Sequence, residues 1–566
     1  MAPAFLAQFF ASQAHAAETA TDAGAGAATG ASATAGAAGS DTAGAAATTA
    51  APSLTDLAMM PTDQSLVGWL VALPIILPLL GAGLTLALRS APRWQAAMTL
   101  AFMAATAFAA VGLSAEVTAN GPMIMAMGNW LPPFGIVIVV DQLSALLVLV
   151  SSLVGLIGLG YALADVDGPG VRYGFYSFYL LLMAGVNGAF STGDIFNLYV
   201  WFEVFLISSF GLMILGGTRV QLDGAVKYGV LNLIATTIFL IAVGATYGAT
   251  GTLNIADLTV IFQQDTSAPV ATLGALFVLA FAMKAAAFPL HFWLPASYHT
   301  PKVIVSALFA GLLTKVGVYS LMRVMVMLFG DKGEAYLPLI AVVGILTAML
   351  GALGALAQTD LKRMAAFLVI SGIGVMLIGV GIGTQAALAG AIVYAVHSIF
   401  VMTAFFLVLG YAERLSGTGN LLRSGGLYGS HGLAAALFLV FGFAVSGLPP
   451  FSGFWPKLML IDASLQTSGW LAVSATVAII LSGFLTTIVV GRSWALVFLK
   501  PADQAPVAGE GGVVARAPDM GLTVVLFAAL VVGLGVFPSI VIEPASVGAA
   551  GLLDPAAYVR SVLEVN

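Results

Sequence analysis

Long apolar stretches separated by short polar connections dominate this chain. From Leu66 onward fourteen such stretches follow one another, and most have about the 20 residues that an α-helix needs to cross the hydrocarbon core of a bilayer. The pattern predicts an all-α, polytopic membrane protein of about 14 transmembrane helices. The expected spans are 66–88, 94–114, 142–164, 175–192, 195–216, 224–249, 271–293, 303–329, 335–357, 362–383, 386–411, 432–461, 471–497 and 519–541.

The positive charges in the connections support this count. Connections after odd-numbered spans carry eleven Lys and Arg residues, whereas those after even-numbered spans carry one, Lys332. Because Lys and Arg concentrate in cytoplasmic loops, the odd connections are expected in the cytoplasm and both termini outside. We therefore expect a multi-pass protein of the bacterial plasma (inner) membrane. The eleven residues are Arg89, Arg93, Arg172, Arg219, Lys302, Lys362, Arg363, Arg414, Arg423, Lys500 and Arg516.

Composition narrows the class of protein further. Sixty per cent of the 566 residues are hydrophobic and 8% are charged, a balance that soluble globular domains do not have. The absence of cysteine excludes disulfides, iron–sulfur clusters and thiolate metal sites. No His/Asp/Glu group has metal-ligand spacing, and no phosphate-binding or dinucleotide-binding loop occurs. We thus expect no metal and no cofactor, and the lack of a basic tract argues against nucleic acid.

Residues 1–58 differ from the remainder of the chain. They are low in large apolar side chains and rich in Ala, Gly, Thr and Ser, so they are expected to be a disordered tail or translated sequence upstream of a true start at Met59 or Met60. Residues 4–16 also resemble a secretory signal, but no Lys or Arg precedes them. The transmembrane domain is expected to comprise residues 59–566.

Two spans combine a lysine with proline breaks. Lys284 lies inside an apolar run that Pro289 and Pro295 interrupt, and a second proline break precedes Lys457. A lysine near the middle of a bilayer costs roughly 2.5–3.5 kcal/mol, and such residues usually mark an ion or proton path. The two spans lie five apart, so they cross in opposite senses. This predicts two inverted five-helix repeats with broken helices, at about 175–329 and 335–497, unless both breaks are ordinary proline kinks.

Six further motifs lie at residues 201–207, 223–228, 284–298, 307–319, 358–363 and 449–457. Together they resemble the antiporter-like subunits, a family that includes the proton-pumping membrane subunits of complex I and the large subunits of Mrp-type sodium/proton antiporters. Four more stretches, 215–219, 227–232, 247–254 and 297–301, favour the D-type branch of the Mrp subunits. The resemblance runs from about Pro61 to the last span.

The resemblance implies a role for particular buried charges. Glu203 is expected to pair with Lys284, with Lys227 near that pair. Lys315 is expected to relay protons laterally, and Lys457 to be the ionisable residue of the second half. An ion pair in low dielectric holds both partners charged, so that moving one charge drives a proton off another.

Each of these residues also has a purely structural interpretation. Glu203 and Lys284 could be a static buried pair that fixes helix register. Lys227 lies four residues after Asp223 and could form an ordinary i,i+4 pair on a helix surface. Arg323 and Arg492, near span ends, are expected to extend their charges to the membrane surface.

Histidines offer further proton carriers. His291 lies in the break seven residues after Lys284, where it could pass protons to water or serve as a hydrogen-bonded structural residue. His397 lies in span eleven near Tyr394. In the family a histidine followed four residues later by a lysine is expected there, but Ser398 and Met402 occupy those positions. Either water, Tyr394 and His397 bridge the gap, or the second half of the path is weakened.

These observations lead to one expected function and two alternatives. We expect a membrane subunit of a multisubunit monovalent cation (Na⁺)/proton antiporter, with other subunits of a hetero-oligomeric complex, the lipid bilayer, protons and monovalent cations as partners. It would be a secondary transporter subunit and not an enzyme. The first alternative is a proton-pumping subunit of a complex I-like NADH dehydrogenase or membrane-bound hydrogenase. The second is a non-transporting scaffold subunit.

Overall fold

A computed structural model describes residues 65–564, apart from 167, 265–267 and 502–516. The described residues all belong to one compact unit, which spans Ala58–Asn566. The expectations for residues 1–58, the tail and the signal-like stretch, lie outside the described residues. Within the described part the chain is helical, with one two-stranded antiparallel hairpin that pairs Met123 with Val140.

The elements follow the predicted spans closely along the chain. The first half comprises α3 (Leu66–Trp69), α4 (Leu73–Ala87), α5 (Pro92–Asn120), β1 (Met123–Ala126), η1 (Met127–Asn129), β2 (Val137–Val140), α6 (Gln142–Asp165), α7 (Gly168–Arg172), α8 (Phe175–Ser191), α9 (Ile195–Ile214), α10 (Arg219–Thr250), α11 (Ile255–Gln263), α12 (Val270–Ala285), α13 (Trp293–Ser297), α14 (Val303–Leu308), η2 (Phe309–Leu313), α15 (Thr314–Leu321) and η3 (Met322–Leu328). The second half comprises η4 (Gly330–Tyr336), α16 (Leu337–Leu356), α17 (Leu361–Ile382), α18 (Gln385–Ser416), α19 (Leu427–Ser430), α20 (Gly432–Ser446), α21 (Phe454–Leu465), α22 (Trp470–Trp494), η5 (Ala495–Leu499), α23 (Ala517–Val536), α24 (Ser539–Leu553) and α25 (Ala556–Leu563).

Many of these helices are long and apolar enough to cross a membrane. Among the described residues nine pass this test, and the pair Met520–Val536 and Ser539–Leu553, bent by 70°, could form one more span. Four shorter apolar helices, α4, α8, α12 and α20, accompany them. The chain is therefore a multi-pass membrane protein. The expected last span is corrected at its end, because the helix stops at Val536 and resumes beyond Pro538.

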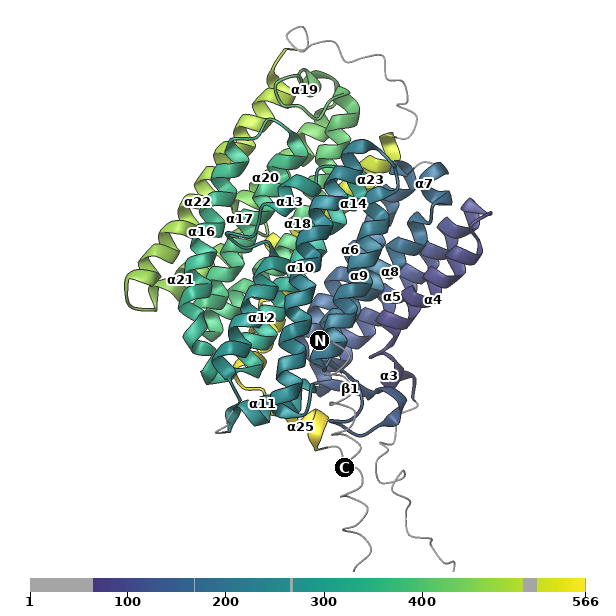
Figure 1. Cartoon of the computed structure of the whole chain (residues 1–566). Helices are drawn as coiled ribbons and strands as arrows, with labels where there is room; N and C mark the ends of the chain where they lie inside the picture. Colours follow the sequence, from purple (N-terminus) through teal and green to yellow (C-terminus); the bar gives the residue numbers. More distant parts are fainter. Residues whose placement is uncertain (1–64, 167, 265–267, 502–516, 565–566) are drawn as a thin grey trace, which may run out of the picture. The chain divides into compact units, whose positions relative to one another are not determined.

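The connections between spans gather at two ends of the bundle. Figure 1 shows α11, α25 and β1 at one end and α7 and α19 at the other. The elements α11 and β1 follow even-numbered spans, whereas α7 and α19 follow odd-numbered spans. This arrangement is the alternation that the Lys and Arg pattern requires.

Two turns at opposite ends of the bundle are built in the same way. In the first, Asp194 forms a bridge with Asn254, and Ile195 N and Ile255 N donate to Leu253 O and Gly193 O at 2.9 Å each. In the second, Asp360 forms a bridge with Asn420. There Leu361 N donates to Gly419 O at 3.0 Å and Leu421 N to Thr359 O at 2.8 Å. Asp194 and Asp360 each cap the helix that follows, α9 and α17.

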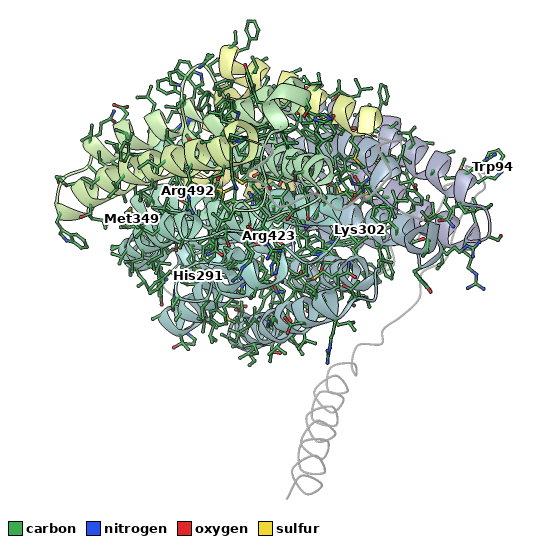
Figure 2. All side chains as sticks on the ribbon, turned by 90° about the horizontal axis from the view of Figure 1, so that it is seen from above. Trp94, His291, Lys302, Met349, Arg423 and Arg492 are labelled. Carbon is green, nitrogen blue, oxygen red and sulfur yellow. The ribbon has the colours of Figure 1, made fainter. Side chains whose placement is uncertain are left out.

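Burial identifies the centre of the bundle. In the continuous helical span Val303–Leu328 and in α18 every residue of the most apolar window is buried, whereas only 39% of that window is buried in α5, α10 and α22. A helix that is apolar on all sides can face either lipid or protein. The buried fraction shows which helices are surrounded by protein and which have an exposed face. Seen from above, Trp94 of α5 lies at one edge of the molecule and Arg492 of α22 toward the other (Figure 2). The span 303–328 and α18 thus form the protein-lined core.

Candidate functional site

Two helices break where the sequence places its prolines. The chain leaves the helical path between α12 and α13 and again between α20 and α21, and each break contains one cis X-Pro bond, Phe288-Pro289 and Pro449-Pro450. Polar partners satisfy groups that the first break exposes: Phe288 N donates to Thr347 Oγ1 at 2.9 Å, and Trp293 Nε1 donates to Met283 O at 3.2 Å. Irregular backbone at membrane depth is tolerated when its polar groups find partners inside the protein, as these two do.

Lys284 occupies the end of α12, directly before the first break. Its side chain is 4% exposed, and Nζ lies 3.4 Å from the carbonyl oxygen of Asn232 in α10 and 5.5 Å from the centre of the Phe202 ring. An aromatic face and a carbonyl oxygen both favour a cation. The position can therefore hold an ammonium ion without a directly bonded carboxylate.

Glu203 lies on α9, close to Lys284 but not bonded to it. Its chain neighbour Phe202 has its ring centre 5.5 Å from Lys284 Nζ. No ion pair closes between Glu203 and Lys284 among the described residues, and Glu203 Oε1 is buried without a hydrogen-bond partner. A buried carboxylate oxygen without a partner is unstable as a static arrangement.

Lys227 occupies a different environment. Its side chain is exposed on the surface of α10 and forms an ion pair of 2.5 Å with Asp223, one helical turn earlier. This is the surface geometry of an ordinary i,i+4 pair. The structure therefore does not bring Lys227 into contact with Lys284 or Glu203.

Lys315 lies in the most buried span, between two π-helical segments. It is the second residue of α15, which directly follows η2, and its side chain is 1% exposed with Nζ donating to Ala310 O at 2.5 Å. A π-helical turn lacks the regular i→i−4 bonds, and such turns often occur at functional sites. The carbonyl that Lys315 contacts belongs to this turn.

His397 lies on α18 beside the second break. Its Nδ1 and Ser452 Oγ are 2.8 Å apart, and its ring packs edge-on against Tyr394 with 5.5 Å between ring centres. A Cβ on Gly453 would lie 2.9 Å from His397 Cε1, so only glycine lets the break approach the ring so closely. A cavity of about 10 Å³ adjoins His397 and Ser452, close to the volume that one water molecule needs.

Lys457 follows the second break, in α21. Its Nζ donates to Val445 O at 3.2 Å and to Ser446 O at 2.7 Å, which are carbonyls at the end of α20. Gly447 has a φ of +85°, and a Cβ there would lie 2.6 Å from Lys457 Cδ, so this glycine both turns the chain and makes room for the lysine. A cavity of about 350 Å³ opens beside Lys457 between α20, α21 and α22.

The three buried lysines share one kind of environment, since each contacts backbone carbonyl oxygens and has no carboxylate bonded to it among the described residues. His397 lies on α18, which packs against η2, the turn directly before Lys315, and against α21, which carries Lys457. The sequence-predicted residues Lys315, His397 and Lys457 are thus brought together across the core. Lys284 and Glu203 form a separate group near the first break.

His291 lies in the first break and is half-buried. Its Nδ1 has no hydrogen-bond partner among the described residues, and its ring lies 6.0 Å from that of Phe288. Figure 2 labels its position among the side chains. A buried ring nitrogen without a hydrogen-bond partner is unusual in a folded protein, because its desolvation is not compensated.

Ser398 and Met402 lie within the buried core of α18, at 2% and 3% exposure. The adjacent Thr403 and Ile399 pack against Gly311 of η2. Met402 places an apolar side chain on the stretch of α18 that follows His397. The departure from the family pattern therefore lies in packed protein, and Met402 is about one and a half helical turns from His397.

The expected position of Arg323 at the membrane surface is wrong. Arg323 is 2% exposed, because Asp141, the residue before α6, lies beside it. Arg323 Nη1 and Nη2 donate to the two carboxylate oxygens of Asp141 at 2.6 and 2.9 Å. Asp141 is 182 positions away along the chain, so spacing could not reveal this pair; the available signal was an arginine inside an apolar span.

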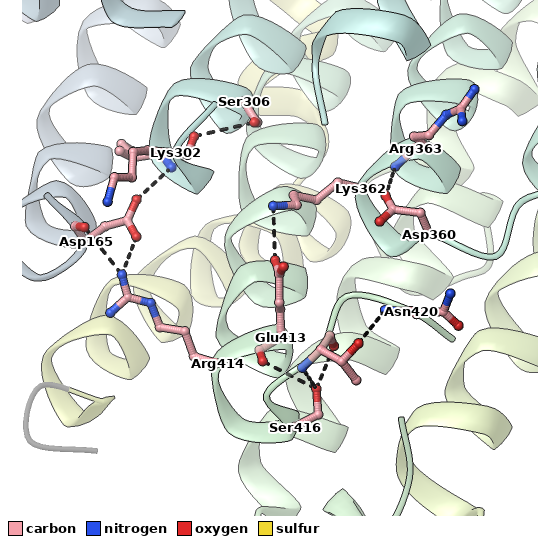
Figure 3. Close-up of polar contacts among 12 residues, drawn as sticks. Asp165, Lys302, Ser306, Asp360, Lys362, Arg363, Glu413, Arg414, Ser416 and Asn420 are labelled. Atoms are coloured by element: carbon pink, nitrogen blue, oxygen red, sulfur yellow. Dashed lines mark hydrogen bonds and ion pairs between the residues drawn. The ribbon is translucent and has the colours of Figure 1, made fainter. Parts of the chain in front are cut away.

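A cluster of charged residues lies at the end of the bundle that holds α7 and α19. The sequence indicates that its Lys and Arg residues share one side of the membrane, but not that they pair with Asp165 and Glu413. This rim cluster, Asp165, Lys302, Lys362, Glu413 and Arg414, lines a cavity of about 790 Å³. Figure 3 shows Arg414 reaching Asp165, at 2.5 Å, and Lys362 reaching Glu413, at 3.1 Å. Asp165 also accepts a bond from Ile304 N at 3.3 Å. The cluster therefore ties the ends of α6, α14, α17 and α18 together.

His299, in the connection near this cavity, has a helix-end role. Its Nδ1 lies 3.0 Å from Pro295 O, and a carbonyl oxygen only accepts, so Nδ1 carries the hydrogen. Burial lowers the pKa of His299 below the usual histidine value, and the nearby Asp360 opposes this shift. The neutral ring is thus favoured near pH 7.

Within the described residues no group of three or more His, Cys, Asp and Glu side chains could hold a metal ion. Of the candidate residues only Glu203 carries a carboxylate, and the others are lysines and histidines.

Comparisons with known proteins agree with this architecture. Residues 192–482 match the family model described as NADH:quinone oxidoreductase/Mrp antiporter, transmembrane. The chain is 37% identical over 497 residues to the D-type subunit of the Na(+)/H(+) antiporter of Alkalihalophilus pseudofirmus, covering 88% of this chain and 99% of that protein.

Solved structures give the same assignment. A chain of the Mrp complex from Dietzia sp. superposes with a TM-score of 0.80 at 30% identity, covering 88% of this chain and 100% of that one. A chain of respiratory complex I from Thermus thermophilus superposes with a TM-score of 0.71 at 25% identity, covering 86% and 100%. This protein belongs to the NADH:quinone oxidoreductase/Mrp antiporter family of membrane subunits.

Proposed function

We propose that this chain is the D-type membrane subunit of a multisubunit Na⁺/H⁺ antiporter and that it translocates protons through buried Glu and Lys residues. The observation that carries the proposal is the set of three lysines, Lys284, Lys315 and Lys457, each almost fully buried and bonded only to carbonyl oxygens among the described residues. A lysine without a carboxylate partner can be charged or neutral in the same position. Such a residue can therefore pass on a proton.

The proposed path has two groups of residues joined through the core. Glu203 and Lys284, with His291 in the adjacent break, form the first group, and Lys315, His397 and Lys457 form the second. Protonation of Lys315 disfavours a second charge at His397 and Lys457, because like charges in low dielectric repel. Such coupling would move protons stepwise across the core. Lys227, paired on the surface, has a peripheral role in this scheme.

The inverted repeat belongs to the same proposal. The bridges Asp194–Asn254 and Asp360–Asn420 have equivalent hydrogen bonds and lie at opposite ends of the bundle, as two repeats of opposite orientation require. The nine long helices, four shorter apolar helices and one bent pair of the described residues correspond one by one to the predicted spans. We infer two five-helix repeats, at about 175–329 and 335–497, within a fourteen-span domain of residues 59–566.

The similarity to the Alkalihalophilus protein favours the antiporter over a redox-driven pump. A complex I-like subunit would use the same residues, and the Thermus thermophilus match keeps it as the second candidate. The two differ in what drives proton movement: a cation gradient in one case and a redox reaction in partner subunits in the other. A transport assay with an imposed Na⁺ gradient and no electron donor distinguishes them.

The first test of the proposal concerns Glu203. Cation-driven proton movement is measured in inverted vesicles that contain the chain with its partner subunits. Glu203→Ala should abolish it while the complex remains assembled, because the proposed pair with Lys284 then loses its carboxylate. Glu334→Ala, which removes an exposed glutamate in η4, is the matched control and should retain transport. Normal antiport in Glu203→Ala would leave Glu203 without a transport role.

A further inference from the structure

The span 303–328 carries a second set of buried polar residues, beyond Lys315. Lys315, Tyr319 and Arg323 follow at intervals of four residues and so share one helix face. Lys315 Nζ turns back toward Ala310 O, whereas Arg323 reaches Asp141 at the start of α6. The face thus extends from Lys315 toward the end of the bundle that holds α11, α25 and β1 (Figure 1).

Arg323 uses all of its hydrogen-bond donors inside the protein. Nε donates to Tyr319 Oη at 3.3 Å, and the two terminal nitrogens donate to both oxygens of Asp141. Their remaining hydrogens go to Met327 Sδ at 3.2 Å and Ser144 Oγ at 3.1 Å. A guanidinium has five N–H groups, so none is left to bind a water molecule.

Aromatic rings complete the enclosure. The guanidinium carbon of Arg323 lies 5.3 Å from the centre of the Tyr319 ring and 5.4 Å from that of Tyr558. Tyr319 donates from its hydroxyl to Phe190 O at 2.9 Å. Tyr558 comes from α25, which contacts α11, α24 and β1. The pair Arg323–Asp141 is therefore dry, fully bonded and covered by a short helix.

We propose that the Arg323–Asp141 pair, covered by Tyr558, is the closed gate between Lys315 and the water at this end of the bundle. The inference rests on the proposed function, since Lys315 is a proton carrier only there. Arginine stays protonated at every physiological pH. Its fixed positive charge repels protons, as it does in selective pores, and its completed bonding interrupts any chain of water molecules. The gate prevents protons from leaking past Lys315 while no cation is exchanged.

If Arg323 and Asp141 were only a static ion pair that fixes helix register, their removal would have a different effect. Removing such a pair lowers assembly or thermal stability but opens no path. Removing a gate instead lets protons pass through complexes that are still assembled. The deciding quantity is the proton leak per assembled complex, with no cation gradient present.

The experiment uses the complete complex in vesicles with an imposed pH gradient and no Na⁺ or K⁺ gradient. The double variant Arg323→Gln with Asp141→Asn replaces the pair by two amides of similar size and leaves no unpaired buried charge. It should raise the leak several-fold over wild type. Tyr558→Ala, which removes only the covering ring, should raise it to a smaller extent, whereas Tyr558→Phe keeps the ring and should not.

Two further variants test where in the protein the leaking protons pass. Lys362→Gln with Glu413→Gln neutralises an ion pair at the opposite end of the bundle and should cause no leak. Adding Lys315→Ala to the double variant should suppress the leak, because the path then lacks its proton carrier. A leak that persists without Lys315 overturns the placement of the gate.

The outcomes separate this inference from the proposed function. No leak per assembled complex from either the double variant or Tyr558→Ala overturns the gate, even if cation-driven transport depends on Glu203 and Lys284 as proposed. Conversely, normal antiport in the Glu203 and Lys284 variants refutes the proposed function whatever the leak assay shows. If the double variant does not assemble, Tyr558→Ala alone decides.

Discussion

At the scale of single residues, the sequence identifies the buried lysines but not their partners. Lys284, Lys315 and Lys457 stand out because lysine is rare in apolar spans, and all three are buried. The expected contact between Glu203 and Lys284 is not closed, and Lys227 is paired on the surface. Arg323 is expected at the membrane surface because it lies near a span end. Its partner Asp141 is 182 positions away along the chain, so the local sequence does not reveal the ion pair. Burial follows from sequence pattern, but long-range pairing does not.

His397 allows a prediction at this scale. His397→Ala should reduce cation-driven proton movement to a small fraction of the wild-type rate, because the proposed path places the His397 ring between Lys315 and Lys457. Transport in inverted vesicles, normalised to assembled complex, measures this. Wild-type transport in His397→Ala would show that protons avoid span eleven.

Met402→Lys is the companion variant. Met402 is 3% exposed, and a lysine there would lie about one and a half turns from His397. Its ammonium group would need water or polar neighbours to solvate it. If the polar path passes this point, Met402→Lys should assemble and keep or raise proton flux. Loss of assembly, together with an unaffected His397→Ala, would indicate a dry, packed helix and favour the scaffold interpretation.

At the scale of elements, apolar length predicts where the long helices lie, because a bilayer sets the length of a crossing helix. Nine described helices are long and apolar enough to cross, and a bent pair could add one more. The short elements α11, α25 and the β1–β2 hairpin are not predicted, since they are too brief to give a periodic signal. The π-helical segments η2 and η3 are not predicted either. A π-turn arises from the packing of neighbouring helices, and its sequence resembles that of any apolar helix. These segments flank Lys315, so the local geometry of the site does not follow from the sequence.

Contact between η2 and α18 can be tested through Gly311. A Cβ at this position would meet Ile399 O at 3.1 Å and collide with Thr403 Oγ1. Gly311→Val should force the two core spans apart, with a stability loss of about 1–3 kcal/mol, typical of overpacking, and slower transport. Gly244→Val, where nothing lies within 4 Å, is the control. Equal thermal unfolding midpoints of the two variants in detergent would contradict this packing.

At the scale of the whole molecule, alternating charge predicts which connections share an end. Even connections gather with α11 and β1, and odd connections with α7 and α19 (Figure 1). Only the excess of Lys and Arg in the odd connections indicates which end of the bundle faces the cytoplasm. The repeat is predicted from two proline breaks, yet the matching bridges at Asp194 and Asp360 give it firmer support. Each bridge joins residues far apart along the chain and leaves no local pattern.

Orientation can be measured directly because the chain has no cysteine. Gln263→Cys at the end of α11 and Arg423→Cys before α19 introduce single exposed thiols at opposite ends. An impermeant thiol reagent added to intact cells should label position 263 and not position 423. The reverse labelling would invert the topology, and labelling of both would contradict the alternation of spans.

The most direct test of proton transport by this chain is Na⁺-driven proton movement in the Lys284→Ala variant of the assembled complex. Lys332→Ala, which removes a partly exposed lysine bonded to Gln264 O, is the matched control. We expect Lys284→Ala to assemble but to exchange no protons for Na⁺, while Lys332→Ala transports at the wild-type rate. Wild-type exchange in an assembled Lys284→Ala complex would contradict proton transport through this lysine.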